Sequence, residues 1–351
     1  PSRGRHALLT AVSLLLATAV WLPAIHLFFA PGHTAPSSSG PLSPPAHALL
    51  ETQLGLWEDP ALREQAQARM RATNAEWDFM GRTFLVLALA NDALRAPAEQ
   101  ARYLAVMDRI IEDTLAVEKE RSMFHFLMPY ARARPFVRQP ARSAFVDGEI
   151  ALMLAARNLI ELREDHEVEL NQRLAELRAG MEAGPVLSAE SYPDECWTFC
   201  NTLSLAAMKL ADARSGRATH EALAARWVSR AKEKLVDPKT GLLVSSYTLA
   251  GETLDGPEGS SIWVSVHALQ LVDPEFAGDQ YERAVEHLGA SFLGFSWARE
   301  WPRSAPHRTD VDSGPIVPVV EASAGSSGLA FLGAAAFGDD LRRWCDGLPV
   351  L

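Results

Sequence analysis

The segment SAESYPDECWTFCNT, residues 188–202, places Cys196 and Cys200 close to Asp194 and Glu195. Four residues apart, the two cysteines would share one face of a helix. A zinc ion needs further soft ligands, but only Cys345 remains, and a disulfide between positions i and i+4 of a helix has poor geometry. We therefore expect neither a metal nor a disulfide here. We expect Cys200 to face a cavity as a free thiol, with Cys196 packed beside it.

Asp194 follows Pro193 and precedes an apolar stretch, so two interpretations stay open. Its carboxylate could accept backbone N–H groups as the N-cap of the helix that follows. It could instead face the cavity with its neighbours.

Glu149 is a second candidate, because it interrupts the apolar segment SAFVDGEIALML. A carboxyl buried there is costly in its charged form, so its pKa is expected to rise. A neutral carboxylic acid near pH 7 suits general-acid catalysis, such as protonation of a leaving hydroxyl. The alternative is a structural role, in which Glu149 lies at the rim or pairs with Arg82 or Arg157. Asp147, two residues earlier, points elsewhere on a helix and is expected to be an N-cap or rim residue.

A third polar group is TDVDSGP, residues 309–315. In a loop over the cavity mouth, Asp312 could act on substrate, and paired carboxylates would suit glycoside hydrolysis. Trp197, Trp263 and Trp297 could then offer stacking faces for sugars. The alternative is an Asx-type turn that only holds the loop.

These residues lie in a chain whose pattern is almost entirely helical from about residue 48 onward. Some segments, such as 143–162, are apolar nearly all round and must be buried, whereas others, such as 166–183, carry one charged face. Alternation of the two kinds indicates two concentric rings of helices, an all-α (α/α) barrel or toroid. A plain helical bundle is the alternative. Residues 241–256 are expected to form a short hairpin.

The amino terminus differs from the rest of the chain in composition. Residues 7–29 carry no Asp, Glu, Lys or Arg, and Arg3 and Arg5 precede them. The length suits a membrane span, and the flanking arginines favour a cytoplasmic N-terminus. We expect residues 1–30 to be an uncleaved transmembrane anchor, although a cleaved signal peptide is the competing interpretation. Residues 31–47, rich in Pro and Ser, are expected to be a linker, with residues 48–351 as the helical domain.

The charge balance argues against nucleic-acid binding. The chain has 33 basic and 44 acidic residues, a formal net charge of −11, and no basic stripe.

The stretch SYPDECWTFCNTLSLAAMKLADARSG, followed by LVDPKTG and VDPEF, resembles the linalool dehydratase-isomerase family. The resemblance implies an (α/α)6 barrel, exported to the periplasm and assembled as a ring of protomers. It also implies cofactor-free acid–base chemistry on an apolar, terpenoid-like alcohol.

The resemblance carries site residues over one position at a time. The family's second active-site cysteine falls on Cys200, and its first falls on Ser191. Its catalytic histidine falls on Glu149, and an N-terminal aspartate falls on Asp78 in NAEWDFMG. The family's tyrosine falls close to Ser261. Glu149, Cys200, Ser191 and Asp78 are therefore the expected catalytic residues. The expected substrate-binding residues are Tyr192, Asp194, Cys196, Trp197, Ser261 and Asp312.

Three functions follow as hypotheses. The first is a membrane-anchored lyase or isomerase, without cofactor or metal, acting on a small apolar alcohol on the periplasmic side of the inner membrane. The second is a carbohydrate-active barrel that uses Asp312 with Glu149 or Asp194. The third is a non-catalytic binding barrel.

Overall fold

The computed structural model describes residues 3–29, 42–292, 295–305 and 313–338, and over these residues the chain is mostly helical. Helix α1 spans Arg3–Phe29. The helices that follow are α2 (Pro44–Glu58), α3 (Pro60–Thr73), α4 (Ala75–Arg95), α5 (Gln100–Arg121), α6 (Ala144–Ile160), α7 (Glu164–Glu182), α8 (Thr198–Ser215), α9 (Glu221–Lys234), α10 (Gly259–Leu269), α11 (Pro274–Leu288) and α12 (Ala324–Phe337). Helix α2 begins inside the segment expected to be a linker, because Ser43 caps it and two prolines open it.

The strands are short and antiparallel. Strand β1 (Cys196–Trp197) pairs with β2 (Ser246–Tyr247), and β2 pairs with β3 (Thr253–Asp255). The β2–β3 pair lies in the segment expected to form a hairpin. Two further pairs are β4 (Gly289–Phe292) with β5 (Phe295–Ala298) and β6 (Ile316–Val317) with β7 (Ala322–Ser323).

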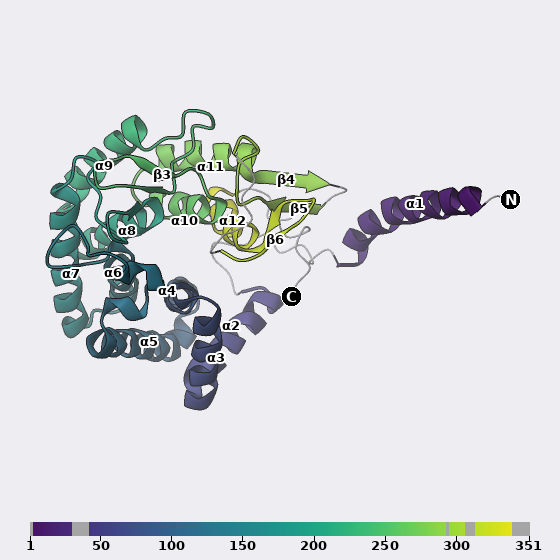
Figure 1. Ribbon diagram of the computed structural model, residues 1–351. Coiled ribbons are helices and arrows are strands. Elements are labelled where there is room, and N and C mark those ends of the chain that lie inside the picture. Colours follow the sequence, from purple (N-terminus) through teal and green to yellow (C-terminus); the bar gives the residue numbers. More distant parts are fainter. Residues whose placement is uncertain (1–2, 30–41, 293–294, 306–312, 339–351) are drawn as a thin grey trace.

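The helices form two layers that follow the expected alternation. Helices α4, α6, α8, α10 and α12 contact one another in that order on the inside of a curved array, and α5, α7, α9 and α11 cover them from outside (Figure 1). Nearly every residue of α6 is buried, whereas α9 and α11 bury one stripe of residues each. Burial on all sides explains why the sequence of α6 is apolar all round.

Helices α6 and α8 make the closest contact of the inner layer. A Cβ atom at Gly148 would lie 2.5 Å from Ser204 Oγ and 3.3 Å from the Cys200 carbonyl oxygen. Only glycine allows this approach of two backbones. Gly148 therefore brings the residue after it, Glu149, against the start of α8.

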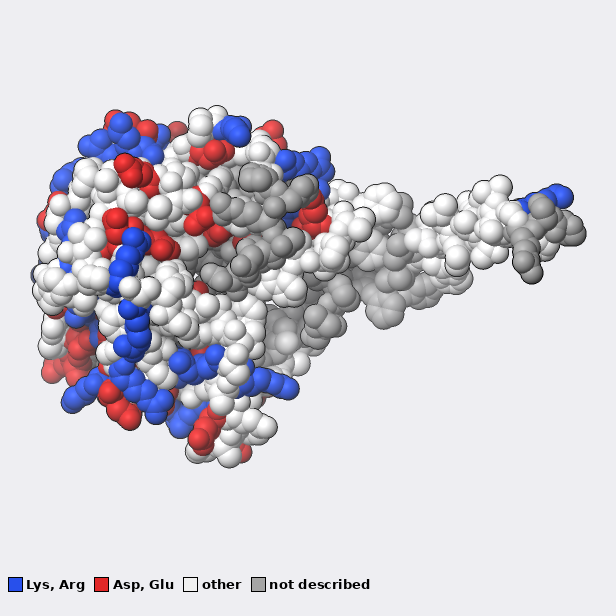
Figure 2. Space-filling view, in the orientation of Figure 1, with Lys and Arg blue, Asp and Glu red and all other residues white. Residues whose placement is uncertain are grey.

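The surface divides into a charged part and an apolar extension. On the face in Figure 2, Lys and Arg side chains alternate with Asp and Glu side chains over the helical array, whereas α1 carries basic side chains only near its free end. The segment Gly4–Trp21 of α1 has a mean hydropathy of 1.3 and no buried residues. This helix has the length and composition of a membrane span or of a signal sequence.

Candidate active site

Hydrogen bonds join the N-terminal ends of the inner helices at one end of the array. The Ala144 N–H of α6 donates to the Glu190 carbonyl (2.6 Å), close before α8. Ser245 joins α8 to α10, because its carbonyl accepts from Thr198 N–H (2.9 Å) and its hydroxyl accepts from Glu258 N–H (2.8 Å). Glu300 joins α10 to α12, accepting from the hydroxyls of Ser260 (2.6 Å) and Ser326 (2.7 Å). Helices α6, α8, α10 and α12 therefore start at the same end, where most of the candidate residues lie.

Glu149 lies in the second turn of α6 and is 1 % exposed. The Thr83 hydroxyl of α4 donates to its Oε2 at 2.6 Å, and no ion pair of the described residues involves it. Arg82 and Arg157, the cations considered as partners for Glu149, instead pair with Asp113 (2.7 Å) and Asp108 (2.6 Å). Burial raises the pKa of Glu149 to about 8, against the opposing effect of the Thr83 hydrogen bond. The group is therefore a neutral acid at pH 7.

The Cys200 thiol hydrogen-bonds with Ser191 and lies within electrostatic reach of Glu149. Burial raises the pKa of the Cys200 thiol well above its ordinary value, a hydrogen bond with Ser191 opposes the rise, and the charge of Glu149 adds to it. The Ser191 hydroxyl also accepts from Trp197 N–H at 3.2 Å. Both cysteines are free, and Cys200 is a neutral thiol rather than a thiolate nucleophile.

A cluster of aromatic rings joins α4, α6 and the start of α8. Phe79 stacks on Phe126 with ring centroids 4.3 Å apart and meets Phe145 edge-on at 5.3 Å. Phe199 packs edge-on against Phe145 and Trp197, both at 5.9 Å. Phe199 and Trp197 are only half-buried, whereas the other rings are buried. Phe145 and Glu149 are four residues apart on α6, so this aromatic cluster lies along the same face of the helix as Glu149, and its least buried rings lie at the start of α8.

Asp78 does not join Glu149. Its carboxylate pairs with Arg82 (3.3 Å) and lies 4.0 Å from Arg71. Burial raises the pKa of Asp78, and Arg82 opposes that rise. The arrangement is a buried ion pair that holds α4 to α3 and, through Arg82 and Asp113, to α5.

The sequence did not single out Glu76, two residues before Asp78. Tyr192 donates its hydroxyl hydrogen bond to Glu76, and accepts one from Met128 N–H at 3.0 Å. The charge of Glu76 also raises the pKa of both Glu149 and Cys200, so it lies within electrostatic reach of each. Glu76 and Asp78 are two residues apart, so they face different sides of α4. This spacing in NAEWDFMG is the sequence signal that distinguishes the two carboxylates.

Several other expected site residues make contacts that stabilise the fold. Asp194 is not an N-cap, because Trp197 precedes α8; it has a φ of 50° and its carboxylate accepts from Leu249 N–H at 3.3 Å. Cys196 belongs to strand β1, so it does not share a helix face with Cys200.

Asp147 is neither a cap nor at the rim but is buried in ion pairs, and Ser143 caps α6. Ser261 is buried at the start of α10, and its hydroxyl has no hydrogen-bond partner among the described residues. Asp312 lies outside the described residues.

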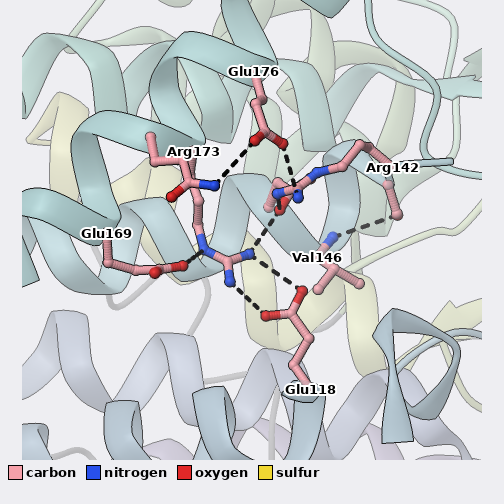
Figure 3. A network of polar contacts seen from close by, with 9 residues as sticks. Glu118, Arg142, Val146, Glu169, Arg173 and Glu176 are labelled. Atoms are coloured by element: carbon pink, nitrogen blue, oxygen red, sulfur yellow. Dashed lines mark hydrogen bonds and ion pairs between the residues drawn. The ribbon is translucent and has the colours of Figure 1, made fainter. Parts of the chain in front are cut away.

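A buried ion-pair network supports α6 from behind the site (Figure 3). Arg173 of α7 contacts Asp147 (2.7 Å) and Glu169 (2.6 Å), and it also pairs with Glu118 of α5. Arg142 contacts Asp147 as well, and Glu176 at 2.8 Å. The network joins α5, α6 and α7 and fixes the helix that carries Glu149.

Among the described residues, no group of three or more His, Cys, Asp or Glu side chains is arranged to hold a metal ion. A pocket of about 140 Å³ lies further along α8, lined by residues that include Met208, Asp212 and His220. It does not include the residues around Glu149.

The fold and site define a mostly helical, two-layered protein with an apolar N-terminal helix and a buried neutral carboxyl group. No family model matches the chain, and no curated protein matches it. A solved structure named as a polysaccharide lyase is similar over 69% of this chain and 74% of that chain, at 13% identity and a TM-score of 0.39.

Proposed function

We propose that this protein is a cofactor-free acid–base enzyme of the linalool dehydratase-isomerase type, acting on a small apolar alcohol. Glu149 is the proton donor. The observation that supports this most is its environment: a fully buried carboxyl group, held by one hydroxyl and without a cation partner in the described residues. Its pKa of about 8 keeps the proton available at neutral pH.

In this proposal the inner and outer helices belong to an (α/α)6-type barrel, and the N-terminal end of the inner layer is its working end. The apolar helix α1 anchors the domain to the inner membrane, with the domain on the periplasmic side. We also propose that protomers of this chain assemble as a homo-oligomeric ring.

The residues divide the work as follows. The Thr83 hydrogen bond orients the Glu149 carboxyl, whose proton passes to the substrate hydroxyl so that the oxygen leaves as water. The neutral Cys200 thiol and the Ser191 hydroxyl contact the substrate beside the leaving oxygen. Because Phe199 and Trp197 are the least buried rings of the aromatic cluster, the substrate enters past them. These apolar rings favour an alkyl or alkenyl alcohol over a sugar.

The test is a substrate screen read by mass spectrometry. The full-length protein, in detergent or lipid discs, is incubated with terpenoid alcohols and with soluble oligosaccharides. We expect turnover of an alcohol, and a loss of about 10²–10⁴-fold in kcat for Glu149→Gln. Glu161→Gln, at the exposed end of the same helix, is the matched control and should stay within about twofold of the wild type. Turnover of oligosaccharides alone, or an active Glu149→Gln variant, would contradict the proposal.

A further inference from the structure

Two carboxyl groups at the start of the inner layer lie in opposite kinds of environment. Glu149 is fully buried and receives one hydroxyl hydrogen bond. Glu76 is half-buried in the first turn of α4, where the helix N-terminus stabilises a negative charge. Asn74 caps that helix by accepting from Glu76 N–H at 2.8 Å. Two nearby carboxyl groups in unlike environments divide into an acid and a base.

Tyr192 holds Glu76 in place. Its hydroxyl donates to the Glu76 carboxylate and accepts from Met128 N–H, and its ring stacks on Tyr130 at 4.6 Å. Burial raises the pKa of the Tyr192 phenol, and the charge of Glu76 adds to the rise. Tyr192 therefore stays protonated and is a permanent donor to the carboxylate. It is also the chain neighbour of Ser191, which contacts Cys200.

We propose that Glu76 is the base that partners the acid Glu149, with Tyr192 as its positioning residue. This inference rests on the proposed function. In the dehydration step, Glu149 gives its proton to the hydroxyl as the C–O bond breaks and water leaves. Glu76 takes a proton from the adjacent carbon, whose C–H electron pair forms the C=C bond. The products are alkene and water, and proton exchange with solvent restores both carboxyl groups.

Asp78 is the competing base on the same helix, and its contacts argue against it. Arg82 and Arg71 both hold its carboxylate, so accepting a proton would break a buried ion pair. The Tyr192 phenol that donates to Glu76 can stay bonded after proton transfer.

The first arm of the test measures turnover of the alcohol by full-length variants. We expect Glu76→Gln to lower kcat by about 10²–10⁴-fold. Tyr192→Phe keeps the stacked ring and should lower kcat at least about tenfold with little change in KM, because the base loses its charge-assisted hydrogen bond. Asp92→Asn is the matched control, since Asp92 is a buried carboxylate near the other end of the same helix that accepts from a tyrosine, Tyr103, at 2.9 Å. It should keep near wild-type kcat.

The second arm needs no substrate and separates this inference from the proposed function. Isotope-edited infrared spectroscopy follows the titration of the Glu149 carboxyl group, and Glu76→Gln should move its midpoint to lower pH because a like charge is removed. An unmoved midpoint, or full activity in Glu76→Gln, overturns the pairing. If the wild type turns over no alcohol, the proposed function fails, whereas a shifted midpoint still supports the coupled carboxyl pair.

Discussion

Among single residues, the proposed chemistry depends most on Glu149, a carboxyl group that is buried without a counter-ion among the described residues. Desolvation acts against the charged form of Glu149, and the Thr83 hydroxyl compensates only in part. Such a group weakens folding at neutral pH, since the unfolded chain can ionise it freely. A carboxyl group whose pKa is raised by desolvation in this way is a candidate functional group.

The stability of Glu149→Gln relative to the wild type should therefore change with pH. The unfolded chain loses this proton near pH 4.5, but the folded protein holds it to about pH 8. Between these values the folded state binds more protons, so wild-type stability falls as pH rises. Glutamine does not titrate and still accepts from Thr83. Between pH 4.5 and 8 the variant should gain up to about 5 kcal/mol relative to the wild type, because one pKa unit corresponds to about 1.4 kcal/mol. Urea unfolding at pH 5 and pH 8 measures the difference, and a pH-independent difference would refute the burial of a neutral Glu149.

At the scale of helices, buried ion pairs tie the inner layer to the outer one. Arg173 reaches from α7 to Asp147 on α6 and Glu118 on α5, with only 6 % of its side chain exposed. Removing one member of such a network leaves the others charged, buried and unpaired. These contacts keep α6, and with it Glu149, in register with α4 and α8.

Arg173→Met should lower the free energy of unfolding by about 3–5 kcal/mol. Arg178→Met on the same helix is the control, because Arg178 pairs with Glu182 at 3.4 Å while 39 % exposed. An exposed pair contributes about 0–1 kcal/mol. Equal effects of the two substitutions in chemical denaturation would show that the network does not hold the layers together.

The sequence predicted the helices well, because the spacing of apolar residues indicates which faces of each helix are buried. The all-round apolar segment 143–162 predicted a buried helix, and α6 is that helix. Contacts between distant segments were harder to predict. Neither spacing nor propensity indicated that Tyr192 would meet Glu76, 116 positions earlier, or that Asp147 would pair with Arg173. The short strand β1, which moves Cys196 out of the helix of Cys200, depends on pairing with β2 and carries no local signal of its own.

At the scale of the whole molecule, the chain joins a charged helical domain to an apolar helix. Side chains from Gly4 to Trp21 are exposed, and the domain offers them no covering surface in the structure. Insertion into a bilayer would remove this apolar surface from water. Under the proposed function, a membrane anchor would hold the domain close to apolar substrates that partition into lipid.

Expression in bacterial cells tests this anchor. The full-length protein should sediment with membranes and resist an alkaline carbonate wash. Val12→Arg combined with Leu15→Arg should release it, since each central arginine costs about 2.5–3.5 kcal/mol of insertion free energy. The alanine pair at the same positions should stay in the membrane. Recovery of a shortened, soluble protein from the wild-type gene would show instead that the helix is a cleaved signal sequence.

The most direct test of the central claim is the ionisation of Glu149 in the folded protein. Carbon-13 glutamate labelling and infrared difference spectra between the wild type and Glu149→Gln isolate this carboxyl group. The account predicts a titration midpoint of about pH 8, raised further in Thr83→Val because that variant removes the one hydroxyl that favours the charged form. A midpoint near 4.5, the ordinary value for glutamate, would contradict the neutral acid on which the proposed chemistry depends.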